Sequence, residues 1–152
     1  MNMKLQISAG IQIQKSTQEV FEAIVNPNHM CHYFIGRSSG KMEEGKDIIW
    51  GFPEMEEDVD IKVGKIVENK YVSFEWKIGD LFLLVEIQLT ERSDGSTIVK
   101  ISEKEMENDE KGIAWLKGNT EGWANFLACL KAYLEYGINL RKGAFLYRFE
   151  NK

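Results

Sequence analysis

The stretch Thr120–Gly137, "TEGWANFLACLKAYLEYG", decides the fold that the sequence predicts. At about 100° per residue, the apolar residues of 115–138 cover one half of a helical wheel. The members of this apolar half are Trp115, Leu116, Gly122, Trp123, Phe126, Leu127, Cys129, Leu130, Tyr133, Leu134, Gly137 and Ile138. A contact with a flat surface needs a stripe of only about 100°. We therefore expect a concave surface to grip this helix.

The segments before this helix predict an antiparallel sheet. Residues 4–14 alternate between polar and apolar, which is typical of a long strand with one buried face. Turn residues such as Asp94-Gly95 separate the later strands, which we place near 35–42, 46–52, 57–68, 71–78, 81–91 and 96–105. The connections are too short for helical crossovers, so the strands form an antiparallel meander.

Two short helices follow the first strand. Ser16 and Glu19 have capping-box spacing, with an apolar stripe after them. Asn26-Pro27 ends that helix and begins a second one over about 28–34, because proline is tolerated at the first position of a helix.

These elements together predict an α+β fold in which about seven strands form a curved antiparallel sheet around the last helix. The chain is expected to form a single domain over 1–152, with a C-terminal tail at 139–152. The tail could add an edge strand, pack over the fold or join a partner.

Composition limits the classes of partner. The net charge of -5 and the pI near 5.2 argue against nucleic acid, which needs a clustered basic surface. No apolar run approaches the ~20 residues of a membrane span, and Met1 opens onto a strand without a signal peptide, so we expect a cytoplasmic protein. The acidic segment 54–60 predicts a solvated loop and strand start.

Four segments of the chain carry a family resemblance. In order, they are STQEVFEAIVNPNHMCHYF, GKMEEGKDIIWGF, VSFEWK and GWANFLACLKAYLEYG. From about Leu5 to Gly137 the chain resembles the proteins similar to the C-terminal domain of the activator of the heat-shock-protein-90 ATPase, which belong to the START-like, or SRPBCC, superfamily. The resemblance implies the helix-grip fold and, as one alternative, a chaperone-associated role. The eukaryotic co-chaperone has an additional N-terminal domain, which this sequence does not contain.

A curved sheet leaves a wedge of space in front of the last helix, and this wedge is the candidate ligand site. The residues predicted to line it are Phe34, Trp50, Trp76, Leu83, Val85, Val99, Ile101, Trp123, Phe126, Leu127 and Leu130. They could hold a hydrophobic or aromatic molecule. The alternative is that the rings fill the core completely.

Metal and catalytic chemistry have little support in the sequence. His29 and His32 supply at most two ligands, with no cluster to complete four, and Cys31 and Cys129 read as buried free thiols. No nucleophile elbow, phosphate loop or zinc motif occurs. We assign the carboxylates of Glu75, Glu86 and Glu103 to outward faces, which disfavours an enzyme.

The sequence therefore predicts a cytoplasmic START-like protein that binds a small hydrophobic molecule without a cofactor. Two alternatives stay open: a chaperone-associated or other protein-interaction module, and a cyclase- or hydrolase-like enzyme. A homodimer is also expected, from the apolar run 81–85 and the aromatic tail 145–149.

Overall fold

A single curved sheet forms the framework of the computed structural model, which describes residues 3–149. Its seven strands are β1 (Leu5–Ile13), β2 (Arg37–Ser38), β3 (Asp47–Gly51), β4 (Val59–Val67), β5 (Tyr71–Ile78), β6 (Leu81–Glu91) and β7 (Thr97–Met106). They lie in the order β1-β7-β6-β5-β4-β3-β2, and every neighbouring pair is antiparallel. The predicted meander is confirmed: β2 to β7 follow one another in the sheet, and the last strand, β7, also pairs with the first, β1.

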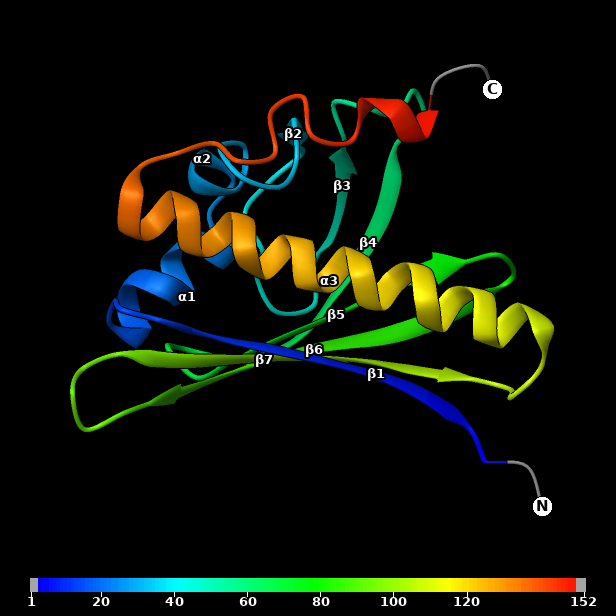
Figure 1. Cartoon of the computed structure of the whole chain (residues 1–152), viewed down its shortest axis with the longest axis horizontal. Helices are drawn as coiled ribbons and strands as arrows, with labels where there is room; N and C mark the ends of the chain where they lie inside the picture. The colour runs from blue at the N-terminus through cyan, green and yellow to red at the C-terminus, as the bar shows by residue number, and fades with distance from the viewer. Residues whose placement is uncertain (1–2, 150–152) are drawn as a thin grey trace.

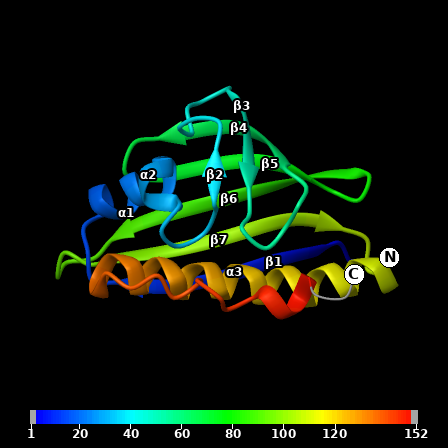
Figure 2. The same ribbon diagram turned by 90° about the horizontal axis from the view of Figure 1, so that it is seen from above.

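Three α-helices lie on one side of the sheet: α1 (Thr17–Val25), α2 (Pro27–Met30) and the long α3 (Glu110–Tyr136). Figure 1 shows α3 crossing this side, and Figure 2 shows it running along the β1 and β7 edge. The described residues include no helix with the length and apolarity that crossing a membrane requires. The α+β helix-grip fold predicted from the sequence is confirmed.

Side-chain caps set the helix ends. The Oγ of Ser16 accepts a hydrogen bond from the amide of Glu19, as the capping-box spacing predicted. Asp109 caps α3 by accepting from the amide of Gly112, so this helix begins at Glu110, before the predicted residue 115. Gly137 ends α3 in the left-handed conformation, with φ 67°, which glycine adopts without steric cost.

Some predicted bounds were too long. Helix α2 ends at Met30 and does not continue to 34; residues 31–34 form turns, and β2 begins at Arg37. The apolar face of α3 was extended too far at its end, since Ile138 lies beyond the helix and is exposed. In the run 81–85, Leu83 and Val85 are buried and Leu81 and Phe82 are exposed; the homodimer stays a prediction.

The tail packs over the fold. After α3 it runs back on the side of the sheet that carries the helices (Figure 1) and forms a 3₁₀ helix, η1 (Leu146–Phe149), which lies beside α3 (Figure 2). Within the described part of the tail, 139–149, no strand forms, so the edge-strand alternative was wrong. The tail therefore covers the open end of the space between sheet and α3.

Candidate ligand-binding cavity

A cavity of about 360 Å³ lies where β4, β5, α3 and the tail meet. Its lining residues are Phe34, Phe52, Met55, Val59, Trp76, Lys77, Ile78, Asn119, Gly122, Trp123, Asn125, Arg141, Phe145 and Arg148. This volume lies within the range of ordinary small-molecule sites, about 300–1,000 Å³. The wedge predicted between sheet and helix thus keeps free volume at one end, where the tail lies over it.

Aromatic rings form the walls. Trp76 from β5 and Trp123 from α3 lie 5.4 Å apart between ring centroids, tilted by 30°. The ring centroid of Phe34 lies 6.2 Å from that of Trp123, and the ring centroid of Phe52 lies 5.2 Å from that of Phe34. Flat rings in such contacts are rigid and apolar, so the walls suit an apolar or aromatic guest.

Behind the two tryptophans lies a buried carboxylate, Glu103, with 0% exposure. Its oxygens accept hydrogen bonds from the indole Nε1 of Trp76 (3.0 Å), Trp115 (3.2 Å) and Trp123 (2.7 Å). The side-chain amide of Asn119 donates to the same group at 3.2 and 3.3 Å. Four donor groups thus converge on one acceptor: one indole from β5, two indoles from α3 and one side-chain amide from α3.

This arrangement, the Glu103 cage, fixes the cavity wall. An indole N–H can only donate, so all three rings need an acceptor when they are buried. Glu103 supplies that acceptor, and hydrogen bonds to a charged group are stronger than those between neutral groups. Because Trp76 and Trp123 also line the cavity, the buried carboxylate holds in place the two rings that a ligand would meet.

The outward assignment of Glu103 was therefore wrong. Along β7 the buried positions include Val99, Ile101 and Glu103, at every second residue, so the alternation of the strand itself turns this carboxylate inward. Glu75 is exposed, as predicted, and Glu86 is half-buried, where it accepts from Tyr71 and pairs with Lys104. The hydrogen bond from Tyr71 lowers the pKa of Glu86.

The tail is attached beside the cavity by an ion pair. Arg141 donates from Nε to Oε1 of Glu54 at 2.9 Å, and their side chains are only 17% and 4% exposed. The guanidinium also lies 5.6 Å from the Phe34 ring and 5.5 Å from the Phe52 ring, within cation–π range. The segment 54–60 was predicted to be a solvated loop and strand start, which was wrong at Glu54, because its carboxylate pairs with Arg141 and is buried.

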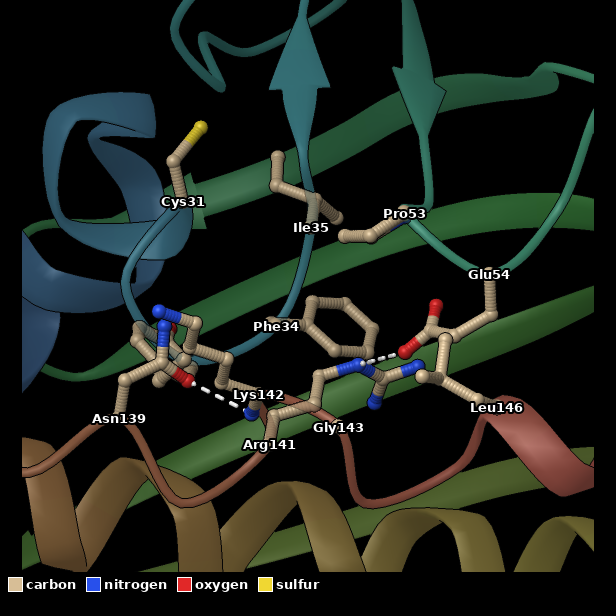
Figure 3. A pocket seen from close by; sticks show the side chains of 11 residues that line it. Cys31, Phe34, Ile35, Pro53, Glu54, Asn139, Arg141, Lys142, Gly143 and Leu146 are labelled. Carbon is tan, nitrogen blue, oxygen red and sulfur yellow. Dashed lines mark hydrogen bonds and ion pairs between the residues drawn. The ribbon is translucent and has the colours of Figure 1, made fainter.

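A second, smaller cavity of about 130 Å³ lies on the other side of Arg141. Figure 3 shows Arg141 between the Phe34 ring and the Glu54 carboxylate, with Asn139 and Lys142 at the far end. Its lining residues are Cys31, Tyr33, Phe34, Ile35, Pro53, Glu54, Asn139, Arg141, Lys142, Gly143 and Leu146. Phe34 and Arg141 line both cavities, so together they form the partition.

The structure separates the predicted lining residues into groups. Phe34, Trp76 and Trp123 line the larger cavity. Trp50 and Phe126 border a gap with no measurable volume, where the rings fill the core. The remaining residues are buried in the core: Leu83, Val85, Val99, Ile101, Leu127 and Leu130. A ligand-binding role for any of these residues stays a prediction.

Several lining residues were missed. Asn119 and Asn125 lie outside the apolar half of the helix predicted from the sequence, yet both line the cavity. Arg141, Phe145 and Arg148 belong to the tail, whose path the sequence left open. Only the aromatic content of 145–149 hinted that this segment would be partly buried.

The candidate metal residues have structural contacts instead. His29 lies 2.6 Å from the hydroxyl of Tyr133 through Nδ1, and the His32 ring stacks on the Tyr133 ring. No group of three or more metal-ligating side chains occurs within residues 3–149. Cys129 is buried, which raises the pKa of its thiol, whereas Cys31 is only half-buried.

A family model identifies the family of the chain. The family model described as "Activator of Hsp90 ATPase homolog 1-like protein" matches residues 15–135. No curated protein matches the chain in sequence.

Solved structures share the fold of the chain. The protein SSP2350 from Staphylococcus saprophyticus is 31% identical, with TM-score 0.79, over 90% of this chain and 96% of that one. The Aha1 dimer from Colwellia psychrerythraea is 22% identical, with TM-score 0.75, over 88% and 98% of the two chains. DynU16, a protein in the dynemicin biosynthetic locus, is 20% identical, with TM-score 0.77, over 88% of this chain and 48% of that one.

Proposed function

Because the chain belongs to the family of Activator of Hsp90 ATPase homolog 1-like proteins and has the START-like helix-grip fold, we propose that it binds a small hydrophobic or aromatic molecule in the larger cavity. The observation that carries this proposal is the open volume of about 360 Å³ between the Trp76 and Trp123 rings and the tail. No cofactor is part of the proposal.

The cavity is suited to binding because its walls are formed in advance. The Glu103 cage holds both indoles in place before a ligand arrives. A site that does not have to order its side chains on binding loses less conformational entropy. A flat aromatic guest could insert beside these rings and gain offset or edge-to-face contacts.

The lining favours binding over acid–base catalysis. Among the described residues that line the cavity there is no Asp, Glu or His. Glu103 lies behind the wall with its oxygens engaged by four donor groups. A general acid or base must come within hydrogen-bond reach of the reacting proton, and no side chain of these types is placed to do so.

Gly122 provides a direct test. It lines the cavity from α3, and a Cβ at this position would meet no atom within 4 Å, so a larger side chain can enter the open space. We expect N-phenyl-1-naphthylamine, an uncharged fluorescent aromatic probe, to bind the natural chain. Gly122→Phe should weaken this binding by about tenfold or more, because the new ring occupies the probe's place.

Gly118→Phe is the matched control. Gly118 lies one turn earlier on α3, also has no atom within 4 Å of an added Cβ, and does not line the cavity. Its substitution should leave the dissociation constant of the probe within about twofold. Fluorescence titration measures both. Equal weakening by the two variants, or no binding to the natural chain, would contradict the proposed site.

A further inference from the structure

The mouth of the larger cavity is positively charged, although the chain as a whole carries a net charge of -5. Arg141 and Arg148, both from the tail, line the cavity beside Phe145. No carboxylate is among the described lining residues; the carboxylates that pair with these arginines, Glu54 and Glu121, lie outside the lining. Lys77 adds a third cation to the lining, and Asn119 and Asn125 add neutral polar groups. The charged side chains of the lining are thus all cationic, which indicates what kind of charged group the ligand carries.

Arg148 is held in position by the tail. Its guanidinium lies 4.4 Å from the centroid of the Phe145 ring and 5.9 Å from that of Tyr147. A planar guanidinium that stacks on aromatic rings loses less freedom when it binds an oxyanion. Its ion-pair partner, Glu121 at 3.1 Å, is 64% exposed, so water and salt weaken this pair and a ligand can compete with it.

The guanidinium of Arg141 has hydrogen-bond donors that its pair with Glu54 does not use. Its bond to Glu54 uses Nε, which leaves the two terminal amino groups of the guanidinium outside that pair (Figure 3). The stacking on Phe34, Phe52 and Phe145 holds the group at the boundary of the two cavities. A guanidinium fork of this kind matches the geometry of a carboxylate or sulfonate.

The two ends of the cavity thus differ in chemistry. The inner end is built from the Trp76 and Trp123 rings, and the tail end carries the two arginines. We propose that the ligand is an amphipathic organic anion, with its apolar body against the tryptophans and its carboxylate- or sulfonate-type group at Arg148 and Arg141. This inference rests on the proposed function and adds the charge and the orientation of the ligand.

Two probes with one aromatic skeleton test the charge. 8-Anilino-1-naphthalenesulfonate carries a sulfonate that N-phenyl-1-naphthylamine lacks, so the ratio of their dissociation constants isolates the anion. Arg148→Met should weaken the sulfonate probe by about threefold or more and leave the neutral probe within about twofold. Glu121→Gln should tighten the sulfonate probe by about twofold, because it removes the carboxylate that competes for Arg148.

Lys142→Met is the control for net charge. Lys142 lies in the same tail and is exposed, but it does not line the larger cavity. Its substitution should leave both probes within about twofold. Arg141 is left intact, because its loss would strand the buried Glu54 carboxylate and could unfold the tail.

The outcomes separate the two proposals. If neither probe binds, the cavity itself fails as a ligand site, and with it the proposed function. The neutral probe could bind while neither Arg148→Met nor Glu121→Gln changes the ratio of dissociation constants. Ligand binding in the larger cavity would then be supported, and the proposal that the ligand is an anion would be overturned. An equal change of this ratio in Lys142→Met would also overturn the proposal of an anionic ligand, since a general effect of net charge would then explain the result.

Discussion

Glu103→Ala is expected to lower the free energy of unfolding by about 3–5 kcal/mol, because it removes the common acceptor of four donor groups, two of them on the buried residues Trp115 and Trp123. The indoles of Trp76, Trp115 and Trp123 and the amide of Asn119 all donate to this carboxylate. A buried donor without a partner costs about 1–3 kcal/mol, and the deletion also leaves a cavity. Urea denaturation followed by far-ultraviolet circular dichroism measures the loss.

A conservative variant isolates the acceptor role. Glu103→Gln keeps the volume of the side chain but replaces one oxygen by an NH₂ group, which then faces donors. We expect it to cost about 2–3 kcal/mol. Glu75→Gln, at an exposed position of β5, should change stability by less than about 0.5 kcal/mol. If the two Gln variants were equally stable, the Glu103 cage would not hold the wall of the cavity.

Trp123→Ala is expected to cost about 3–5 kcal/mol, the usual range for a packed aromatic residue. The Trp123 ring is 3% exposed, and it contacts Trp76, Phe74 and Phe126 in addition to donating to Glu103. Thermal or denaturant unfolding of the ligand-free protein gives the value. A change near zero would mean that the ring stands in open space and contributes little packing.

Trp123→Phe divides that loss into its parts. Phenylalanine keeps much of the ring contact but lacks the N–H, so Glu103 loses its shortest hydrogen bond, 2.7 Å. We expect a loss of about 1–2 kcal/mol, clearly less than for alanine. Equal losses for the two variants would assign the whole effect to the hydrogen bond and none to packing.

The fold was predictable because its signals are local and periodic. Alternation marked β1, the Asp94-Gly95 turn marked the β6–β7 hairpin, and the Ser16 cap marked α1. The broad apolar face of α3 predicted a concave partner, and the curved sheet is that partner (Figure 2). Each signal needs only a few neighbouring residues to be read.

The Glu103 cage shows a different kind of error. The alternation of β7 placed position 103 on the same face as Val99 and Ile101, yet the charge of the residue favoured the outside. Register is the stronger constraint, because a strand cannot turn one side chain outward without a bulge. The several tryptophans of the sequence were the signal that could have identified an inward carboxylate, because a buried indole N–H usually finds an acceptor.

The tail contacts could not have been predicted from local patterns. Glu54 and Arg141 are 87 residues apart and share no element or periodic pattern. The distribution of free volume is equally non-local: Trp50 and Phe126 border filled core, whereas Trp76 and Trp123 face an open cavity. All four are large apolar rings on inward faces, and only the detailed packing separates them.

The indole N–H signals of the four tryptophans give the most direct test of the central claim, that the larger cavity binds a small apolar molecule. Trp76 and Trp123 line this cavity and Trp50 does not, so the chain contains its own reference. Two-dimensional ¹H–¹⁵N spectra would be recorded during titration with N-phenyl-1-naphthylamine, with each signal assigned by a Trp→Phe variant. We predict that the Trp76 and Trp123 signals shift saturably and that the Trp50 signal moves least. Unchanged Trp76 and Trp123 signals at concentrations where the probe is bound would contradict the account, because the probe would then occupy another place.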